Sequence, residues 1–242
     1  MNIMKKIATK AVDNMNASHV TIAFLGDSVT QGCFEIYKTE DNSIDTVFEK
    51  EHAYHTKLNM IFSVLYPSVP INMINAGISG DNAPHGLERL ERDVLCHKPD
   101  LVVVCFGLND SGSGLENISK YTEALQGIFH TLINRGIEVI FMTPNRMNTR
   151  VSVHIRDKDI QEIARATMKI QCDGILDTYL NEAKKVCAEC GVPVCDCYEK
   201  WNTLYKNGVD VTELLSNKIN HPSRQMNWLF AVSLLETMMQ DC

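Results

Sequence analysis

The stretch GDSVTQG, residues 26–32, follows directly on the apolar run VTIAFL, residues 20–25. A short apolar run that ends in turn-forming residues is typical of a buried strand. Ligands bind in open α/β sheets at the carboxyl ends of the strands, so Ser28 would lie at a binding edge. Taken alone, Ser28 is either a nucleophile or a residue that caps the next helix.

Strands and helices alternate along the rest of the chain. Apolar runs predict strands at residues 19–25, 71–75, 101–106, 137–142 and 192–197. Apolar residues at helical spacing predict helices at residues 1–18, 52–65, 83–96, 116–134, 160–168, 175–190 and 224–239. We expect loops at 34–50 and 146–157, and irregular or short-helical structure at 201–220. This order predicts an α/β fold, a three-layer α/β/α sandwich with a doubly wound, five-stranded parallel sheet of flavodoxin-like topology, in a single domain over residues 1–242.

The composition is ordinary for a soluble protein and argues against several kinds of partner. A net charge of −7 at pH 7 disfavours nucleic-acid binding, which requires a basic surface. No stretch reaches about 18 consecutive apolar residues, so we expect no membrane span. The first 20 residues lack the apolar core of a signal peptide, and we expect a cytoplasmic protein. The sequence does not decide the oligomeric state, and a homo-oligomer is one alternative.

Nine cysteines without a secretion signal predict reduced thiols rather than a disulfide framework. Four of them lie close together in CAECGVPVCDC, residues 187–197. The CxxC half is similar to a zinc knuckle, but the segment also fits the end of a helix followed by a strand. We favour that structural interpretation and predict no metal site and no organic cofactor.

Three further polar turns occur later in the chain: NAGISGD at residues 75–81, GLND at 107–110 and NHP at 220–222. Each of the first two ends a predicted strand, and the third precedes the last helix. Together with GDSVTQG, they resemble the four sequence blocks of the SGNH hydrolases, also called the GDSL esterase/lipase family. The resemblance extends from about residue 20 to the final helix.

The resemblance implies the SGNH hydrolase fold and a role for each of four residues. Ser28 would be the nucleophile and His221 the base that removes its proton. A serine hydroxyl needs such a base, and histidine titrates near neutrality. Attack on an ester also places negative charge on the carbonyl oxygen, which needs fixed donors. The expected oxyanion hole consists of the backbone N–H groups of Ser28 and Gly77 and the side-chain amide of Asn109.

The last block departs from the family at one position. The family has an aspartate three residues before the histidine, where this chain has Lys218. We favour two replacements as the group that orients His221: the side chain of Asn217, and a backbone carbonyl, which would leave a serine–histidine dyad. A distant acid, Asp210 or Asp196, is a third alternative.

These residues predict a serine esterase that acts through an acyl-enzyme on Ser28, and the resemblance to the SGNH hydrolases implies small acyl esters as substrates, often acetyl esters of sugars. Its partner would be a small-molecule ester, with Arg146, Asn145 and Trp201 as candidates to line the pocket. An O-acyltransferase using the same site is one alternative. A non-catalytic ligand-binding module of the same fold is another, which the missing aspartate favours. A flavin- or phosphate-binding protein would leave GLND and NHP without a role.

Overall fold

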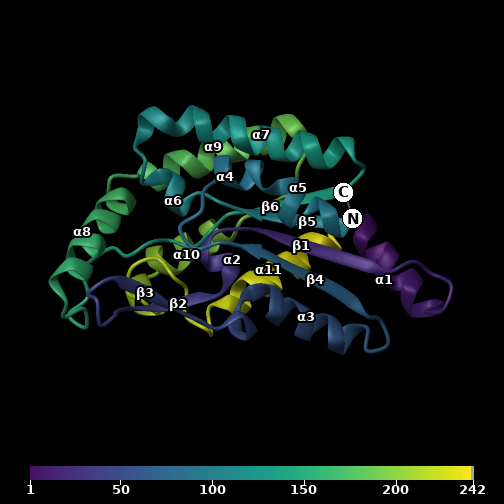
Figure 1. Cartoon of the computed structure of the whole chain (residues 1–242), viewed down its shortest axis with the longest axis horizontal. Coiled ribbons are helices and arrows are strands. Elements are labelled where there is room, and N and C mark those ends of the chain that lie inside the picture. The colour runs from purple at the N-terminus through teal and green to yellow at the C-terminus, as the bar shows by residue number, and fades with distance from the viewer. Residues whose placement is uncertain (241–242) are drawn as a thin grey trace.

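A five-stranded parallel sheet lies at the centre of the fold (Figure 1). The computed structural model describes residues 1–240. Along the chain the strands are β1 (Val20–Gly26), β4 (Ile71–Gly77), β5 (Leu101–Cys105), β6 (Glu138–Met142) and β7 (Val194–Cys195). Their spatial order is β4-β1-β5-β6-β7, and every pair is parallel. The chain therefore winds outward from β1 in both directions, and the predicted doubly wound sheet is confirmed.

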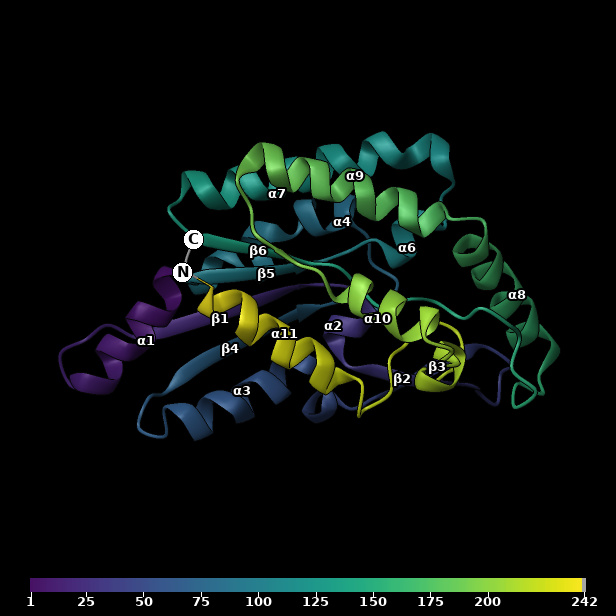
Figure 2. The same cartoon turned by 180° about the vertical axis from the view of Figure 1, so that it is seen from behind.

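Helices cover both faces of this sheet (Figure 1 and Figure 2). One face carries α1 (Asn2–Val12), α3 (Tyr54–Leu65) and α11 (Asn227–Met239). The other face carries α4 (Ala83–Glu88), α5 (Leu90–Asp93), α7 (Ile118–Asn134) and α9 (Ile175–Cys190). The remaining α-helices are α2 (Ser28–Gln31), α6 (Leu108–Ser111), α8 (Lys158–Cys172) and α10 (Cys197–Lys206). Short 3₁₀-helices are η1 (Lys50–His52), η2 (Leu95–His97), η3 (Leu115–Asn117) and η4 (Val211–Leu214).

Burial on both faces explains why the strand sequences are apolar. In β1, Ile22 and Phe24 belong to the core beneath α3 and α11, whereas Ala23 and Leu25 belong to the core beneath α7 and α9. A strand between two helical layers has no solvent-facing side, so both sets of positions are apolar. The carboxyl end of β1, where Ser28 follows, lies between β4 and β5. This is the point at which the winding reverses, and where ligands bind in such sheets.

The prediction of a loop at residues 34–50 is wrong. β2 (Cys33–Lys38) and β3 (Ile44–Phe48) form an antiparallel hairpin there, separate from the main sheet. The pairing register shifts between Cys33 and Ile36, as it does at a β-bulge. Most residues of the hairpin are half-buried or exposed, so its sequence lacks the apolar alternation that predicts a strand.

Three other predicted elements differ from the structure. The helix expected at residues 1–18 ends at Val12. The helix expected at residues 83–96 is divided into α4, α5 and η2, and Arg89, between the first two, has φ −94° and ψ 1°. The strand expected at residues 192–197 is reduced to β7. It ends there because Asp196 accepts a hydrogen bond from the N–H of Glu199 at 3.1 Å and so caps α10.

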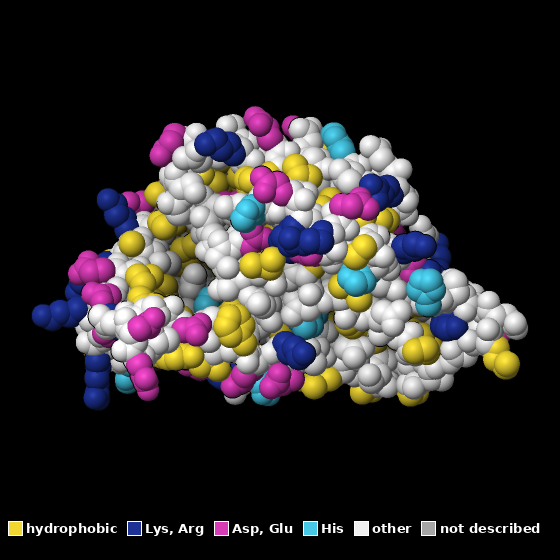
Figure 3. All heavy atoms as spheres, in the orientation of Figure 1, with side chains coloured by type: hydrophobic (Ala, Val, Ile, Leu, Met, Phe, Trp, Pro, Cys, Tyr) yellow, Lys and Arg dark blue, Asp and Glu magenta, His cyan; other side chains and the backbone are white. Residues whose placement is uncertain are grey.

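The β2–β3 hairpin also exposes large apolar side chains. Tyr37, Ile44 and Phe48 are 40–52% exposed. Figure 3 shows hydrophobic side chains in this region, with basic and acidic side chains interspersed over the same face of the molecule. Within residues 1–240, no helix combines the length and the apolarity that crossing a membrane requires.

Candidate active site

Ser28 is the first residue of α2, directly after β1. The side chain of Asp27 caps this helix by accepting a hydrogen bond from the N–H of Val29 at 2.9 Å. The cap fixes the turn that carries Ser28, of which only 4% is exposed. The N–H of Ser28 lies in the first turn, where a backbone donor has no intrahelical acceptor. Ser28 therefore presents both a hydroxyl and a backbone donor at the carboxyl end of the central strand.

The imidazole of His221 contacts the hydroxyl of Ser28. Nε2 lies 3.0 Å from Ser28 Oγ, and Nδ1 lies 2.8 Å from the carbonyl oxygen of Phe34 in β2. Because a carbonyl oxygen only accepts, Nδ1 carries the proton, and Nε2 of the neutral ring accepts a hydrogen bond from the Ser28 hydroxyl. Burial lowers the pKa of His221, and the Phe34 carbonyl and the Glu35 carboxylate oppose that effect. A neutral ring in this tautomer is the form that a general base needs.

Asn217 does not contact the imidazole, and its assignment as the orienting side chain is corrected. Its Oδ1 accepts hydrogen bonds from the N–H groups of Ile219, Asn220 and His221 at 2.9–3.0 Å. Asparagine often folds back on its own backbone in this way. Asn217 therefore shapes the loop that carries His221. The other favoured replacement, a backbone carbonyl, fits the structure, with Phe34 as its source.

The acids considered as distant alternatives also lie elsewhere. Asp210 is paired with an arginine and Asp196 with a lysine. Lys218 has a left-handed backbone with φ +59°, and its Nζ lies 2.9 Å from the carboxylate of Glu213. In the described part of the chain, no acidic side chain is hydrogen-bonded to the ring of His221. The contacts form a serine–histidine dyad.

Gly77 does not fit its expected place in the oxyanion hole. Its N–H donates to Oδ1 of Asn75 at 3.0 Å, which is the pattern of an Asx turn. The backbone of Gly77 also packs against α2 so closely that a Cβ atom would lie 2.2 Å from the backbone nitrogen of Gln31. Glycine is required here by that close approach. The spacing of Asn75 and Gly77 is the sequence signal for this turn, and it was available in NAGISGD.

Gly80 offers the donor that Gly77 lacks. In residues 77–81 the other four N–H groups have acceptors, which are Asn75 Oδ1, Gly26 O, Gln31 Oε1 and Ile78 O. The N–H of Gly80 has none among the described residues, and its φ of +79° is left-handed. Asn109 lies beside the same loop, since its Nδ2 donates to the carbonyl of Asp81 at 2.8 Å. The geometry favours Gly80, the second glycine of the block, which sequence reasoning missed.

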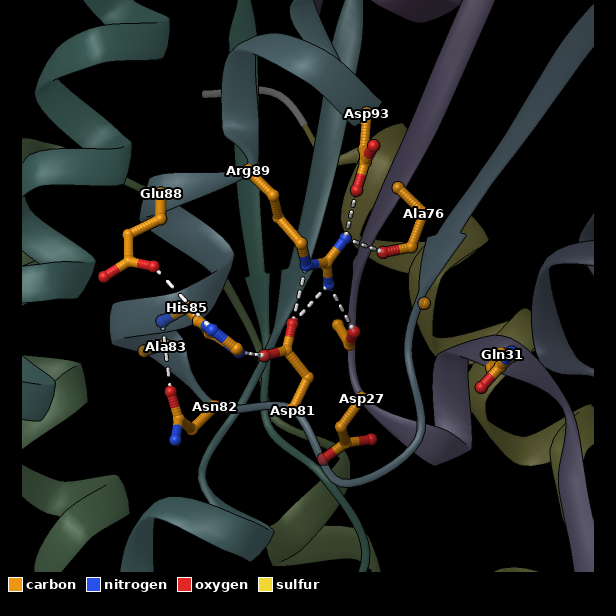
Figure 4. Close-up of polar contacts among 12 residues, drawn as sticks. Asp27, Gln31, Ala76, Asp81, Asn82, Ala83, His85, Glu88, Arg89 and Asp93 are labelled. Carbon is orange, nitrogen blue, oxygen red and sulfur yellow. Dashed lines mark hydrogen bonds and ion pairs between the residues drawn. The ribbon is translucent and has the colours of Figure 1, made fainter. Parts of the chain in front are cut away.

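A buried arginine joins the ends of β1 and β4 to this loop (Figure 4). The guanidinium of Arg89 donates to the carbonyl oxygens of Gly26 at 3.0 Å and Ala76 at 2.7 Å, and to Oδ2 of Asp81 at 2.6 Å. Gly26 precedes the turn that carries the serine, and Asp81 follows Gly80. Arg89 therefore fixes the turn that carries Ser28 relative to the loop. Sequence reasoning missed it because an arginine in a helical pattern is ordinarily exposed.

Two carboxyl groups near the site have raised pKa values. Burial raises the pKa of Asp27 to about 7 and that of Asp110 to about 6. One oxygen of each has no hydrogen-bond partner among the described residues. The other oxygens accept from backbone N–H groups of Val29 and Ala83. Both carboxyls therefore hold turns together, as expected for residues that shape the site without carrying its proton.

None of the three residues expected to line the substrate pocket is found lining one beside Ser28 and His221: two are buried, and the cavity that Arg146 lines includes neither Ser28 nor His221 in its lining. Trp201 is fully buried in a small apolar cluster. Asn145 is buried as well, and its Nδ2 donates to the carbonyl of Asn220 at 2.8 Å, which supports the loop that carries His221. Arg146 lines a cavity of about 420 Å³ between α9 and α10, where its guanidinium lies 4.5 Å from the ring centre of Tyr205.

The cysteine cluster follows the structural interpretation. Cys187 and Cys190 lie in the last turn of α9, as predicted for the end of a helix. The Sγ atoms of Cys195 and Cys197 are buried and 3.7 Å apart. Within residues 1–240, no three His, Cys, Asp or Glu side chains are arranged to hold a metal ion.

Known protein sequences are similar to this chain. The sequence model of the GDSL-like lipase/acylhydrolase family matches residues 24–229. A curated acetylxylan esterase from Geobacillus stearothermophilus is 33% identical over 89 residues, which are 37% of this chain. The aligned stretch spans only 39% of the length of that relative.

Solved structures share the fold. A catalytic mutant of an acetylxylan esterase from Geobacillus stearothermophilus has a TM-score of 0.66 at 19% identity, covering 93% of this chain and 96% of that one. A two-domain esterase active on acetylated mannans has a TM-score of 0.66 at 18% identity, covering 98% and 52%. A lipase/acylhydrolase from Enterococcus faecalis has a TM-score of 0.64 at 22% identity, covering 90% and 95%. At these identities the likeness confirms the predicted fold and nothing finer.

The family match begins within β1 and ends in α11, so it contains Ser28, Asn109 and His221. It confirms the resemblance that the four sequence blocks indicated, and it agrees with the prediction of a carboxylic ester hydrolase. Because the match extends over most of the chain, it decides the assignment. The chain belongs to the GDSL-like lipase/acylhydrolase family.

Proposed function

We propose that this protein is a serine esterase in which Ser28 is the nucleophile and His221 the general base. The observation that supports this most is a continuous line of contacts. Ser28 Oγ meets Nε2 of His221 at 3.0 Å, and the opposite nitrogen of the ring is held by the Phe34 carbonyl at 2.8 Å. A serine that only caps a helix needs neither contact, whereas a nucleophilic serine needs both.

The reaction follows from this geometry in two stages. Ser28 Oγ attacks the carbonyl carbon of the ester while its proton moves to Nε2 of His221. The carbon–oxygen bond to the alcohol then breaks, and His221 returns the proton to the departing oxygen, which leaves the acyl group on Ser28. A water molecule then attacks the acyl carbon while His221 takes one of its protons. The bond from that carbon to Ser28 Oγ breaks, and His221 returns the proton to Ser28 Oγ, which releases the carboxylic acid.

The negative charge of each tetrahedral intermediate needs donors that are already in place. We assign the N–H groups of Ser28 and Gly80 and the side-chain amide of Asn109 to this task. Nδ2 of Asn109 donates one of its two hydrogens to the Asp81 carbonyl, so the second hydrogen can be donated to the oxyanion. Fixed donors of this kind are worth about 10²–10³ in turnover each.

Small acyl esters of carbohydrates are the proposed substrates, with acetyl as the acyl group. Ser28 and His221 are 4% and 6% exposed, so the reacting group must be small enough to reach a nearly buried dyad. The names of the relatives support the same class, because an acetylxylan esterase and an esterase active on acetylated mannans are both among them.

Release of acetate from acetylated xylo-oligosaccharides tests the proposal. The unmodified protein should release acetate, and the variants Ser28→Ala and His221→Ala should lose nearly all of that activity. Release at an undiminished rate by Ser28→Ala would overturn the proposal. Adding an unacetylated sugar distinguishes hydrolysis from transfer, because a transferase would form a new acetyl-sugar in place of free acetate.

A further inference from the structure

One arginine forms ion pairs that join the hairpin, which supplies the Phe34 carbonyl, to the His221 segment. Arg224 follows His221 by three residues. Its guanidinium binds Oε1 and Oε2 of Glu35 at 2.7 and 2.9 Å, and both carboxylate oxygens of Glu49 at 2.6 and 2.8 Å. It also lies 4.5 Å from the ring centre of Phe34. One side chain therefore connects the segment that carries His221 to both sides of the hairpin at its open end, to β2 through Glu35 and to the residue after β3 through Glu49.

Contacts with other parts of the chain position the hairpin, among them the Arg224 ion pairs and the packing of Ile36 against the cluster that contains Ile219. β2 pairs with β3 alone and with no strand of the main sheet. The register shift between Cys33 and Ile36 places Phe34 and Glu35 in the irregular part of the ladder. A bulge can direct a backbone group away from the partner strand, here toward the imidazole, but it also weakens local pairing. Contacts from outside the hairpin must then keep the Phe34 carbonyl in place.

The cluster also carries charge. Arg224 lowers the pKa values of Glu35 and Glu49 through its hydrogen bonds, so both are ionised at neutral pH. Two carboxylates and one guanidinium leave a net charge of about −1 beside a base that becomes positive during the reaction. Glu49 also lies 3.8 Å from Nε2 of His52 on η1. The family's aspartate would supply such a negative charge directly, and here Lys218 stands at its position.

We propose that Arg224 is a positioning residue for the proposed esterase, and that its clamp on Glu35 and Glu49 replaces the orienting role of the missing aspartate. Arg224 fixes the Phe34 carbonyl on the Nδ1–H of His221, which keeps the ring aimed at Ser28. The two carboxylates supply the negative charge that favours the protonated ring. The inference rests on the esterase function proposed above.

Steady-state kinetics with p-nitrophenyl acetate across pH test this proposal. Arg224→Met keeps an unbranched stem but removes the charge and the donors of the guanidinium. Arg135→Met is the matched control, because Arg135 forms an exposed ion pair with Glu91 on another part of the surface. Arg224→Met should lower kcat by about 10- to 100-fold, as misplacement of a catalytic group does, while KM stays within about twofold. Arg224→Lys should recover part of the loss, because an ammonium group can bind one of the two carboxylates.

The acid limb of the pH profile separates positioning from general loosening. Removing the positive charge of Arg224 should raise the apparent pKa of His221, whereas Glu35→Gln removes a negative charge and should lower it. If Arg224→Met does not fold, Glu49→Gln serves in its place and should lower kcat with little change in KM. The proposal is overturned if Arg224→Met retains the kcat of Arg135→Met, or if the Arg224 and Glu35 variants shift the limb in the same direction. Failure of the esterase function itself would be seen separately, as absence of turnover in the unmodified protein.

Discussion

The Nδ1–H of His221 donates to the carbonyl oxygen of Phe34 at 2.8 Å, across 187 residues of sequence. This contact decides which nitrogen of the ring faces Ser28 and in which protonation state. A neutral carbonyl orients the ring as an aspartate does, but it adds less stabilisation to the charged ring. The imidazole should therefore remain a base over a wide pH range, and the enzyme should turn over more slowly than one with a full triad.

The pH dependence of activity should show an acid limb below pH 6.5. Burial lowers the pKa of His221 from its usual value, so the ring loses its proton at a lower pH than an exposed histidine does. Only the neutral ring accepts the Ser28 proton, so kcat/KM should rise with pH through this pKa and then level off. The measurement is kcat/KM for p-nitrophenyl acetate from pH 4 to 8. A limb centred above pH 6.5 would contradict the burial of the ring.

Asn217 should matter for stability rather than for the orientation of the ring. Asn217→Ala leaves three backbone N–H groups without their acceptor, which should lower the free energy of unfolding by about 1–3 kcal/mol. Loosening of this loop should also lower kcat. Asn217→Asp retains an acceptor oxygen and should keep most of the stability. Urea unfolding of the three proteins at pH 7 measures this, and an alanine variant of undiminished stability would refute the role in the loop.

Asn109→Ala should reduce turnover because it removes a hydrogen-bond donor to the oxyanion. Loss of this amide should lower kcat by about 10²–10³ with little change in KM, because the donor acts mainly on charge that develops in the transition state. Asn117→Ala is the matched control, since Asn117 also donates to a backbone carbonyl, that of Ser113 at 2.7 Å. Equal kcat values for the two alanine variants would remove Asn109 from the oxyanion hole.

Asp27→Asn should become more stable relative to the unmodified protein as the pH rises from about 4 to about 7. Burial raises the pKa of the folded Asp27 carboxyl to about 7, above its usual value of 3.8. Between these values the folded state holds a proton that the unfolded state has lost, so stability falls as the pH rises. Asparagine does not titrate and escapes this loss, which amounts to a few kcal/mol at most. Urea unfolding of both proteins from pH 4 to 8 tests this, and parallel stability curves would contradict the raised pKa.

Several residues of the site could be found in the sequence because local signals mark them. Ser28, Asn109 and His221 each stand in a short polar block at the end of a strand or before a helix, and the order of strands and helices predicts that the blocks meet. The sequence prediction of Gly77 rather than Gly80 as the backbone donor to the oxyanion differs from the structure because of one local hydrogen bond. Asn75 takes up the N–H of Gly77, which leaves Gly80 with the unpaired donor.

The orienting group could not be found in the same way. A backbone carbonyl is present in every residue, so nothing in the sequence distinguishes that of Phe34. It reaches His221 only because residues 33–48 form a hairpin, and that hairpin lacks the apolar alternation that would predict it. The role of Arg89 could not be predicted from the sequence for a related reason, since its burial depends on the break between α4 and α5.

The nucleophilic role of Ser28 is tested most directly by covalent labelling with an organophosphate, followed by peptide mass spectrometry. Ser63→Ala is the matched control, because Ser63 is an exposed serine on α3 whose hydroxyl donates to a backbone carbonyl. The unmodified protein and Ser63→Ala should both carry one adduct on Ser28, and His221→Ala should be labelled far more slowly. A labelled serine other than Ser28, or hydrolysis of p-nitrophenyl acetate by Ser28→Ala at the unmodified rate, would contradict the proposed mechanism.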